Sequence, residues 1–155
     1  MTGMLVGIYT AAGEGVPMEA HDEIAAIAGA GLAGDRYAAS AGAFSDKPGG
    51  GREVTLIARE GIAAANDEGV TVGEHETRRN LVTEGVDLDQ LVGRTFSVGD
   101  VVLRGVRDCP PCKYLEGLTR PGVMAALKGR GGLRADIVSA GTLRVGDKIA
   151  EVDAV

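Results

Sequence analysis

The sequence predicts a mostly β fold that contains the corners of a β-barrel. Glycine is frequent, with 25 of 155 residues, whereas aromatic residues make up only 3% of the chain. This composition favours many tight turns between short strands over a helical bundle. A strand, a Gly-Asp turn and a second strand occur twice, in residues 95–102 and 142–149. Such a repeated hairpin pattern is typical of the corners of a barrel.

Apolar runs and turn residues place the other elements along the chain. We expect strands or extended segments at residues 3–11, 53–57, 77–83, 95–98, 101–106, 133–138 and 148–152. Residues 24–30 form a short apolar run before a turn. Short helices are expected at residues 59–67, 112–118 and 121–128, with a helical turn at 88–92. Residues 38–51 are rich in Ala, Ser and Gly, which predicts a mobile loop that could cover a site.

The overall composition is that of an ordinary soluble globular protein, with 45% apolar and 25% charged residues. A chain of this length can bury a core of its own, so we expect a single domain over residues 1–155. The first residues lack the pattern of a signal peptide, and no apolar run is long enough to span a bilayer. We therefore expect a cytoplasmic protein that does not bind membranes. The net charge of −6 argues against a nucleic-acid partner.

The most informative segment is residues 107–115, which contain the only two cysteines, Cys109 and Cys112. The segment follows an apolar strand and begins a helix, where backbone N–H groups and the positive helix end favour a thiolate. A thiolate can act as a nucleophile, a sulfur carrier or a ligand for a soft metal. The two prolines between the cysteines indicate a rigid turn.

The C-x-x-C spacing has other interpretations as well. Thiol–disulfide exchange is one of them, although the strand-rich surroundings lack the βαβ pattern of thioredoxin-like proteins. A zinc site would need two more ligands, and His21 and His75 do not have the spacing of a zinc finger. The cysteines could also be small buried core residues. In the cytoplasm, a structural disulfide is the weaker interpretation.

Arginine outnumbers lysine twelve to four, and planar guanidinium groups suit phosphate and carboxylate ligands. Compositional bias of the genome would explain the same excess. If residues 78–80 begin a strand, alternation places Arg78 and Asn80 on one face and Arg79 on the other, so that one arginine can face a pocket. The glycine-rich segment 129–134 carries Arg130 and Arg134, and its glycines allow close approach to a ligand.

Residues 29–34 read Gly-Ala-Gly-Leu-Ala-Gly, which matches the dinucleotide-binding fingerprint letter by letter. That fingerprint must open a helix so that a pyrophosphate can bind at the helix start. Here Asp35 and Arg36 lead into a loop rich in Gly and Ser instead. We therefore interpret the segment as a glycine turn that places Asp35 and Arg36 at the mouth of a loop.

Seven segments resemble, in the same order, the MOSC family, which is named for the C-terminal domain of molybdenum cofactor sulfurases. They include Arg78-Arg79-Asn80-Leu81-Val82 and Pro111-Cys112-Lys113-Tyr114-Leu115, and the others are residues 31–36, 54–57, 91–100, 129–135 and 141–147. The resemblance covers nearly the whole chain, which looks like a small stand-alone bacterial member of the family. It implies a distorted β-barrel with a few short peripheral α-helices. It also implies that Cys112 carries sulfur or ligates molybdenum, whereas Cys109 lies outside the family pattern.

The resemblance further implies a molybdenum-dependent reductase of N-hydroxylated compounds, with Cys112 as the catalytic residue and the metal ligand of the molybdenum cofactor (molybdopterin). A small-molecule substrate would be reduced with electrons from a separate donor protein, because no flavin or iron–sulfur motif is present. Arginine forks and glycine N–H groups suit the phosphate of the pterin. The residues expected to bind the cofactor are Asp35, Arg36, Arg79, Asn80, Arg130, Gly131, Gly132 and Arg134.

Two alternatives remain open at this point. The chain could be a non-catalytic carrier, in which a Cys112 persulfide or a bound cofactor passes between this chain and a cofactor-supplying protein. It could also be a C-x-x-C thiol–disulfide oxidoreductase, which needs no metal. Pyridoxal phosphate is bound by a separate domain of the large family members, for which this chain has no room, so we do not expect this chain alone to bind it.

Overall fold

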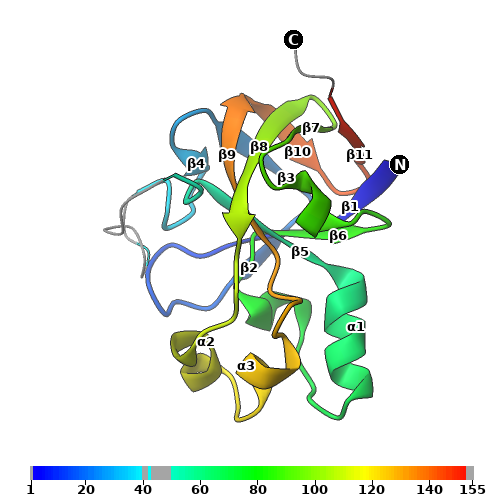
Figure 1. Ribbon diagram of the computed structural model, residues 1–155. Coiled ribbons are helices and arrows are strands. Elements are labelled where there is room, and N and C mark those ends of the chain that lie inside the picture. Colours follow the sequence, from blue (N-terminus) through cyan, green and yellow to red (C-terminus); the bar gives the residue numbers. More distant parts are fainter. Residues whose placement is uncertain (1, 40–41, 43–49, 153–155) are drawn as a thin grey trace.

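The computed structural model describes residues 2–39, 42 and 50–152 and has a closed, mostly β architecture (Figure 1). Seven strands form a barrel: β1 (Thr2–Thr10), β5 (Val54–Ala58), β6 (Leu81–Glu84), β7 (Thr95–Val98), β8 (Val101–Asp108), β9 (Leu133–Ser139) and β11 (Lys148–Glu151). Strand β2 (Glu19–His21) extends this sheet beyond β1. A second sheet contains β3 (Glu23–Ile27), β4 (Gly31–Leu32) and β10 (Gly141–Arg144). The predicted fold class, a mostly β barrel with short helices, is confirmed.

The strand order around the barrel is β11-β7-β8-β9-β5-β6-β1, and the pairing of β1 with β11 closes it. Among the described strands, β5 and β6 form the one parallel pair, and the other ladders are antiparallel. A parallel pair needs a crossover connection. Helix α1 (Arg59–Asp67) and the 3₁₀ helix η1 (Glu74–Thr77) provide it. The crossover ends at residues 78–80, next to the start of β6.

The helices α1, α2 (Lys113–Leu118) and α3 (Val123–Ala126) lie together at one end of the barrel, away from both chain ends (Figure 1). A further 3₁₀ helix, η2 (Leu88–Leu91), follows β6. Helix α3 is shorter than the predicted segment 121–128, because Gly122 and Gly129 adopt positive φ values on either side of it. In the described part of the chain, no helix is long and apolar enough to cross a membrane.

The core has two apolar clusters, one on each face of the β5–β6 wall. Leu56 and Leu81 point into the barrel and pack with Phe96, and all three are fully buried. The next residue of each strand, Ile57 and Val82, points to the other side because side chains alternate along a strand. The outer cluster also contains Ile62 and Ala65 of α1, Leu115 of α2, Val123 of α3 and Leu127, which directly follows α3. It therefore fixes the helices that carry part of the site.

The first predicted Gly-Asp corner is a hairpin of the barrel, whereas the second is a turn that leads from the small sheet into the barrel. Gly99 and Asp100 join β7 to β8, and Gly146 and Asp147 join β10 to β11. Gly99 has a φ of 57° and Gly146 a φ of 100°, which glycine adopts without a steric penalty. At the second corner, the Asp147 carboxylate accepts a hydrogen bond from the Arg144 N–H at 2.8 Å.

The expected strand at residues 77–83 is only partly present, because β6 begins at Leu81. Arg78 ends η1 with a φ of 60° and a ψ of 20°, which is the left-handed conformation. It is the one residue other than glycine with a positive φ in the described part of the chain. Arg78 and Arg79 thus precede the strand, and the alternation predicted for residues 78–80 does not apply to them.

Candidate functional site

A small cavity between the barrel wall and α2 contains several of the predicted site residues. Its volume is about 30 Å³, and its lining residues are Arg36, Tyr37, Thr55, Arg78, Arg79, Cys109, Cys112, Tyr114, Leu115 and Arg134. We call it the arginine–cysteine cavity. It brings together Arg36, Arg79, Cys112 and Arg134, which lie far apart in the sequence. The loop predicted over residues 38–51 falls mostly outside the described residues.

Cys109 and Cys112 are both free thiols that line this cavity. Cys109 directly follows β8 and is only 1% exposed, and its N–H donates to the Gly132 carbonyl at 2.8 Å. Cys112 is half-buried, immediately precedes α2 and packs against the outer apolar cluster. The predicted strand-to-helix position of the cysteine segment is therefore confirmed, and Cys112 is the more accessible of the two thiols.

The Arg79 side chain binds backbone carbonyl groups. Its guanidinium donates to the carbonyl oxygens of Gly131 at 2.8 Å, Cys109 at 2.9 Å, and Thr77 and Pro110 at 3.2 Å each. Arg79 is 8% exposed, so water competes little for these bonds. Hydrogen bonds from a charged donor contribute about 1.5–3 kcal/mol each. Arg79 therefore fixes the cysteine loop against the 129–132 loop.

Arg78, which lines the cavity, has an unused donor. Its Nη1 donates to the Val16 carbonyl at 2.7 Å. Its Nη2 is buried and has no hydrogen-bond partner, and it is the one such side-chain nitrogen or oxygen among the described residues. Burial lowers the pKa of the Arg78 guanidinium from its usual value, and the positive charge of Arg36 lowers it further. A buried donor without a partner is costly, which points to an anionic ligand at this position.

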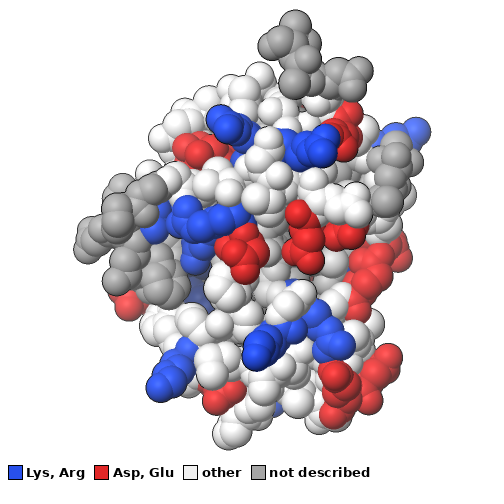
Figure 2. Space-filling model, in the orientation of Figure 1, with Lys and Arg blue, Asp and Glu red and all other residues white. Residues whose placement is uncertain are grey.

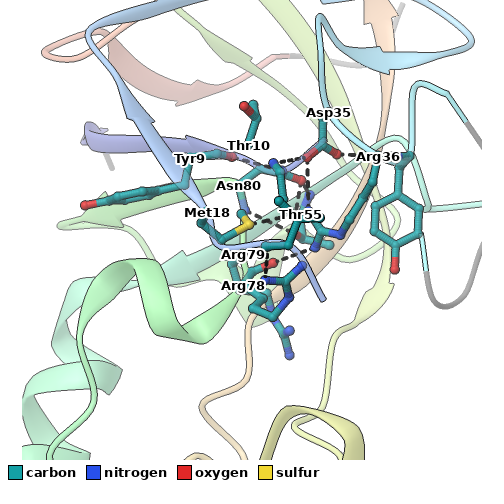
Figure 3. A network of polar contacts seen from close by, with 12 residues as sticks. Tyr9, Thr10, Met18, Asp35, Arg36, Thr55, Arg78, Arg79 and Asn80 are labelled. Atoms are coloured by element: carbon teal, nitrogen blue, oxygen red, sulfur yellow. Dashed lines mark hydrogen bonds and ion pairs between the residues drawn. The ribbon is translucent and has the colours of Figure 1, made fainter. Parts of the chain in front are cut away.

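Asp35 and Arg36 form a buried ion pair beside the cavity (Figure 3). Arg36 Nη1 lies 3.0 Å from Asp35 Oδ1, and the two side chains are 6% and 0% exposed. The Asp35 carboxylate also accepts from the Ala11 N–H at 3.1 Å, and Arg36 Nη2 donates to the Arg78 carbonyl at 3.0 Å. The pair thus ties the end of β1 to the left-handed turn at Arg78.

Asn80 is fully buried and joins three strands next to the cavity. Its Oδ1 accepts from the Thr55 N–H at 3.0 Å and from the Thr55 hydroxyl at 3.2 Å. Its Nδ2 donates to the Tyr9 carbonyl at 3.1 Å. These contacts connect β1, β5 and the start of β6 (Figure 3). Asn80 therefore supports the cavity from behind, and its amide group is occupied by the protein.

The structure places Arg130, Gly131 and Gly132 outside the arginine–cysteine cavity. Arg130 lines a neighbouring cavity of about 140 Å³ and pairs with Glu68. Gly131 and Gly132 line another cavity of about 280 Å³. A Cβ on Gly131 would collide with the Cys109 carbonyl, and one on Gly132 with the Leu56 carbonyl. These two glycines therefore allow backbone segments of the protein to pack closely against each other.

Further arginines extend the positive charge beyond the cavity. Burial lowers the pKa of Arg52, and the nearby charges of Arg107 and Arg134 lower it further. Figure 2 shows a group of basic side chains beside the grey residues, whereas acidic side chains follow the right edge of this face. In a chain with a net charge of −6, such a local excess of arginine favours an anionic ligand.

The described residues contain no group of three or more His, Cys, Asp or Glu side chains that could hold a metal ion. Tyr37, Thr55, Tyr114 and Leu115 also line the cavity, although they are not among the predicted site residues, because such residue types are common in any core or loop. The excess of arginine in the sequence did indicate Arg78 as a candidate for binding an anion.

No curated protein matches this chain. Its structure is similar to the YuaD protein from Bacillus subtilis, with a TM-score of 0.80 and 20% identity, over 96% of this chain and 94% of that one. It is also similar to YiiM from Escherichia coli, with a TM-score of 0.71 and 18% identity, over 100% of this chain and 71% of that one. These similarities show the fold. The pattern of the MOSC domain matches residues 40–150. The chain therefore belongs to the MOSC domain family, which is known for binding the molybdenum cofactor.

Proposed function

We propose that this MOSC protein binds the molybdenum cofactor at the arginine–cysteine cavity and acts as a molybdenum-dependent reductase of N-hydroxylated compounds. One observation carries the proposal: a free, partly exposed thiol at Cys112 lines the same cavity as Arg78, whose Nη2 has no partner. A thiolate is a soft metal ligand, and a guanidinium is a strong donor to phosphate. A cofactor that combines a metal with a phosphate needs both groups.

The residues present fit such a cofactor chemically. The Cys112 thiolate suits a high-valent metal that already has dithiolene sulfur ligands. The absence of further metal-ligating clusters from the described residues agrees with a metal that brings most of its own ligands. Arg78 and Arg134 line the cavity and would hold the anionic part. Arg36, Arg79 and Asn80 support these residues through the contacts described above.

The size of the cavity sets a condition for binding. A volume of about 30 Å³ is enough for a water-sized group, so a pterin enters only when the wall opens. The loop between β1 and β2 is tied to the wall by the Val16 carbonyl on Arg78 and by the Met18 sulfur, 3.5 Å from Arg36 Nη1. We infer that this loop moves away when the cofactor binds.

When bound, the cofactor would supply two-electron chemistry at molybdenum. The Sγ atom of Cys112 would ligate the metal. Arg79 would keep the thiol in place, because it holds the carbonyl groups of Cys109 and Pro110 in the same loop. Arg78 would bind the anionic group through Nη2. Electrons would come from a separate donor protein.

A sulfur carrier is the second candidate, and the size of the cavity favours it. A Cys112 persulfide adds one sulfur atom, which needs far less space than a pterin and leaves the Val16 contact in place. The positive charges of Arg78 and Arg134 would stabilise the persulfide anion. In this case the protein would pass sulfur or cofactor to other proteins without turnover of its own.

The proposal is tested by the metal and pterin content of protein purified without oxygen from a host that makes the cofactor. Wild type should carry both, Cys112→Ser should lose molybdenum, and Cys109→Ser is the matched control that should retain it. Turnover of an amidoxime with an artificial electron donor then separates the reductase from the carrier. Wild-type protein without molybdenum, or Cys112→Ser with a full load, would contradict the cofactor assignment.

A further inference from the structure

We propose that a second cavity beside Arg78 binds a small amphipathic carboxylate, which is a ligand with one carboxylate group on an apolar body. The volume of this cavity is about 220 Å³. It is lined by residues of η1 and the turn after it, by Gly15, Pro17 and Met18 of the loop between β1 and β2, and by Leu118 and Thr119 at the end of α2. We call it the loop–helix cavity. Arg78 lines both this cavity and the arginine–cysteine cavity.

The other polar side chains of the loop–helix cavity already have partners. The Glu76 carboxylate lies with its Oε2 2.6 Å from Arg120 Nη2, and its Oε1 accepts from Arg120 Nη1 at 3.2 Å. The hydrogen bonds from Arg120 lower the pKa of Glu76, although burial opposes this shift. The Thr119 hydroxyl donates to the Leu115 carbonyl at 2.8 Å. The negative charge of Glu76 is therefore compensated by Arg120 and not by Arg78.

Arg78 keeps a positive charge that no carboxylate compensates. Arg36 pairs with Asp35, as Arg120 pairs with Glu76, whereas no ion pair joins Arg78 to another described residue. Its Nη2 is buried without a hydrogen-bond partner. The unmet polar group of this cavity is therefore a cationic donor, and the matching ligand is an anion.

The contact that Arg78 makes with the loop is one that a ligand can replace. Nη1 donates to the Val16 carbonyl at 2.7 Å, and this bond is exposed to solvent. A carboxylate can accept from both terminal nitrogens of a guanidinium at once, in the bidentate geometry that such pairs favour. The exposed Val16 carbonyl would then bind water. The exchange replaces one neutral acceptor with a charged one and gives Nη2 a partner.

The opposite side of the cavity is apolar. Pro17, Met18 and Leu118 line it, and the Leu118 side chain is 43% exposed. An apolar ligand body in this position removes the leucine surface and its own surface from water, which favours binding. The cavity thus offers an apolar side and one cationic donor.

Size and lining together define the class of ligand. A volume of about 220 Å³ is far above the roughly 10–15 Å³ that one water needs, so a single six-membered ring has room. An inorganic anion would leave the apolar side uncovered. An uncharged apolar compound would leave Arg78 without a partner. A small aromatic or branched carboxylate satisfies both sides.

A bound carboxylate would also affect the neighbouring cavity. The Nη2 atom that it occupies is the atom assigned above to the anionic group of the cofactor. One guanidinium cannot serve both anions, so the carboxylate would compete with loading of the cofactor. This competition rests on the function proposed above, whereas the binding site does not.

The test titrates the full chain, free of cofactor, with three probes and follows the amide chemical shifts. Benzoate has the ring and the charge, acetate has only the charge, and benzamide has only the ring. Benzoate should bind at least tenfold more tightly than either of the others. The largest shifts should fall in residues 15–18, 75–78 and 118–119. Inorganic phosphate should weaken benzoate binding, because both anions need Arg78.

Two pairs of variants separate the two sides of the cavity. Arg78→Met should weaken benzoate binding at least tenfold, whereas Arg94→Met should not, because Arg94 is an exposed arginine that pairs with Glu151 outside the cavity. Leu118→Asn should weaken benzoate binding at least threefold and leave acetate unchanged. Val138→Asn is its control, because Val138 is 52% exposed and does not line the cavity.

Equal affinity of wild type for benzoate and benzamide, or shifts centred elsewhere on the molecule, would overturn the proposal. This comparison needs no variant, so a variant that fails to fold does not decide it. Benzoate binding in a protein that never carries molybdenum would leave the loop–helix cavity assigned and refute the function proposed above. Molybdenum bound through Cys112 in a protein that does not bind benzoate would do the reverse.

Discussion

Arg78 and Arg79 are neighbours in the chain, yet their guanidinium groups have different partners. Arg79 is surrounded by four backbone carbonyl groups and has its donors engaged. Arg78 binds one carbonyl and leaves Nη2 buried without a partner. The left-handed turn at Arg78 causes this division, because it sends the two side chains in different directions. Arg79 thus serves stability, and Arg78 is available to a ligand.

Arg79→Met is expected to lower the free energy of unfolding by about 3–5 kcal/mol, because it leaves buried carbonyl groups without a donor. Arg78→Met should change stability by less than about 1 kcal/mol, because the cost of burying the unpaired Nη2 disappears together with the Val16 bond. Urea unfolding followed by circular dichroism measures both. Equal losses in the two variants would contradict the division of roles.

Arg78→Met should also weaken the binding of inorganic phosphate at least tenfold, measured by calorimetry or by amide chemical shifts. Arg120→Met is the matched control, because Arg120 is a partly exposed arginine that pairs with Glu76 and does not line the cavity. Unchanged phosphate affinity in Arg78→Met would remove Arg78 from the anion site.

At the scale of elements, two connections set the shape of the site. The 129–132 loop packs its backbone against Cys109 and against Leu56 in β5. The Glu53 carboxylate joins the turn after β3 to β9, because its Oε1 accepts from the N–H groups of Gly29 at 3.1 Å and Ile137 at 3.0 Å. The first connection links a loop to the barrel wall, and the second links the small sheet to it.

Gly132→Ala should cost several kcal/mol of stability, and Gly129→Ala should cost about 1–2 kcal/mol. Both glycines have positive φ values, but an added Cβ meets the Leu56 carbonyl at position 132 and open space at position 129. The difference between the two variants in urea unfolding isolates the close approach of the two backbones. Identical losses would show that conformational strain alone matters.

Glu53→Gln is expected to stabilise the protein at neutral pH. Burial raises the pKa of Glu53 from its usual 4.5, and Asp136 raises it further, although the Ile137 and Gly29 N–H groups oppose this. Wild type therefore loses stability as the pH rises through the interval between the unfolded and the folded pKa. The glutamine keeps an acceptor oxygen and has no charge. Its advantage in thermal unfolding should appear above that interval and vanish well below pH 4.5.

At the scale of the whole molecule, a closed barrel carries the cavity, and the loop between β1 and β2 contacts two of the arginines that line it. The barrel is closed by seven strands, whereas residues 11–18 contact the cavity wall through Val16 and Met18. Opening this loop breaks few bonds, and opening the barrel breaks a whole ladder. Any change of shape on ligand binding is therefore expected in the loop.

Hydrogen exchange should report this movement. On loading with the molybdenum cofactor, the amides of residues 11–18 should exchange faster, because Val16 and Met18 lose their contacts with the arginines. The amides of β5 and β6 should keep their protection and serve as the internal control. Slower exchange in residues 11–18 would mean that the loop closes over the cofactor, contrary to this expectation.

Some parts of this molecule could be predicted because one local signal decides them. Gly99-Asp100 and Gly146-Asp147 are turn residues, and each forms a turn between two strands, although only the first turn joins two paired strands of the barrel. Arg78 could not be placed, because its left-handed conformation depends on the end of η1 and on the Arg36 bond to its carbonyl. For the same reason the sequence could not show that Asn80 is occupied by Thr55 and Tyr9. Tertiary contacts decide these roles.

The closure of the barrel has a consequence for folding during synthesis. Strand β1 is synthesised well before β11, and the two strands pair with each other. While the chain emerges from the ribosome, the N–H and C=O groups on one side of β1 remain unpaired. Such unpaired groups can form hydrogen bonds with other chains. Pairing between such distant segments is also slow. Quality-control factors would therefore meet this protein at β1, in the interval before β11 is released.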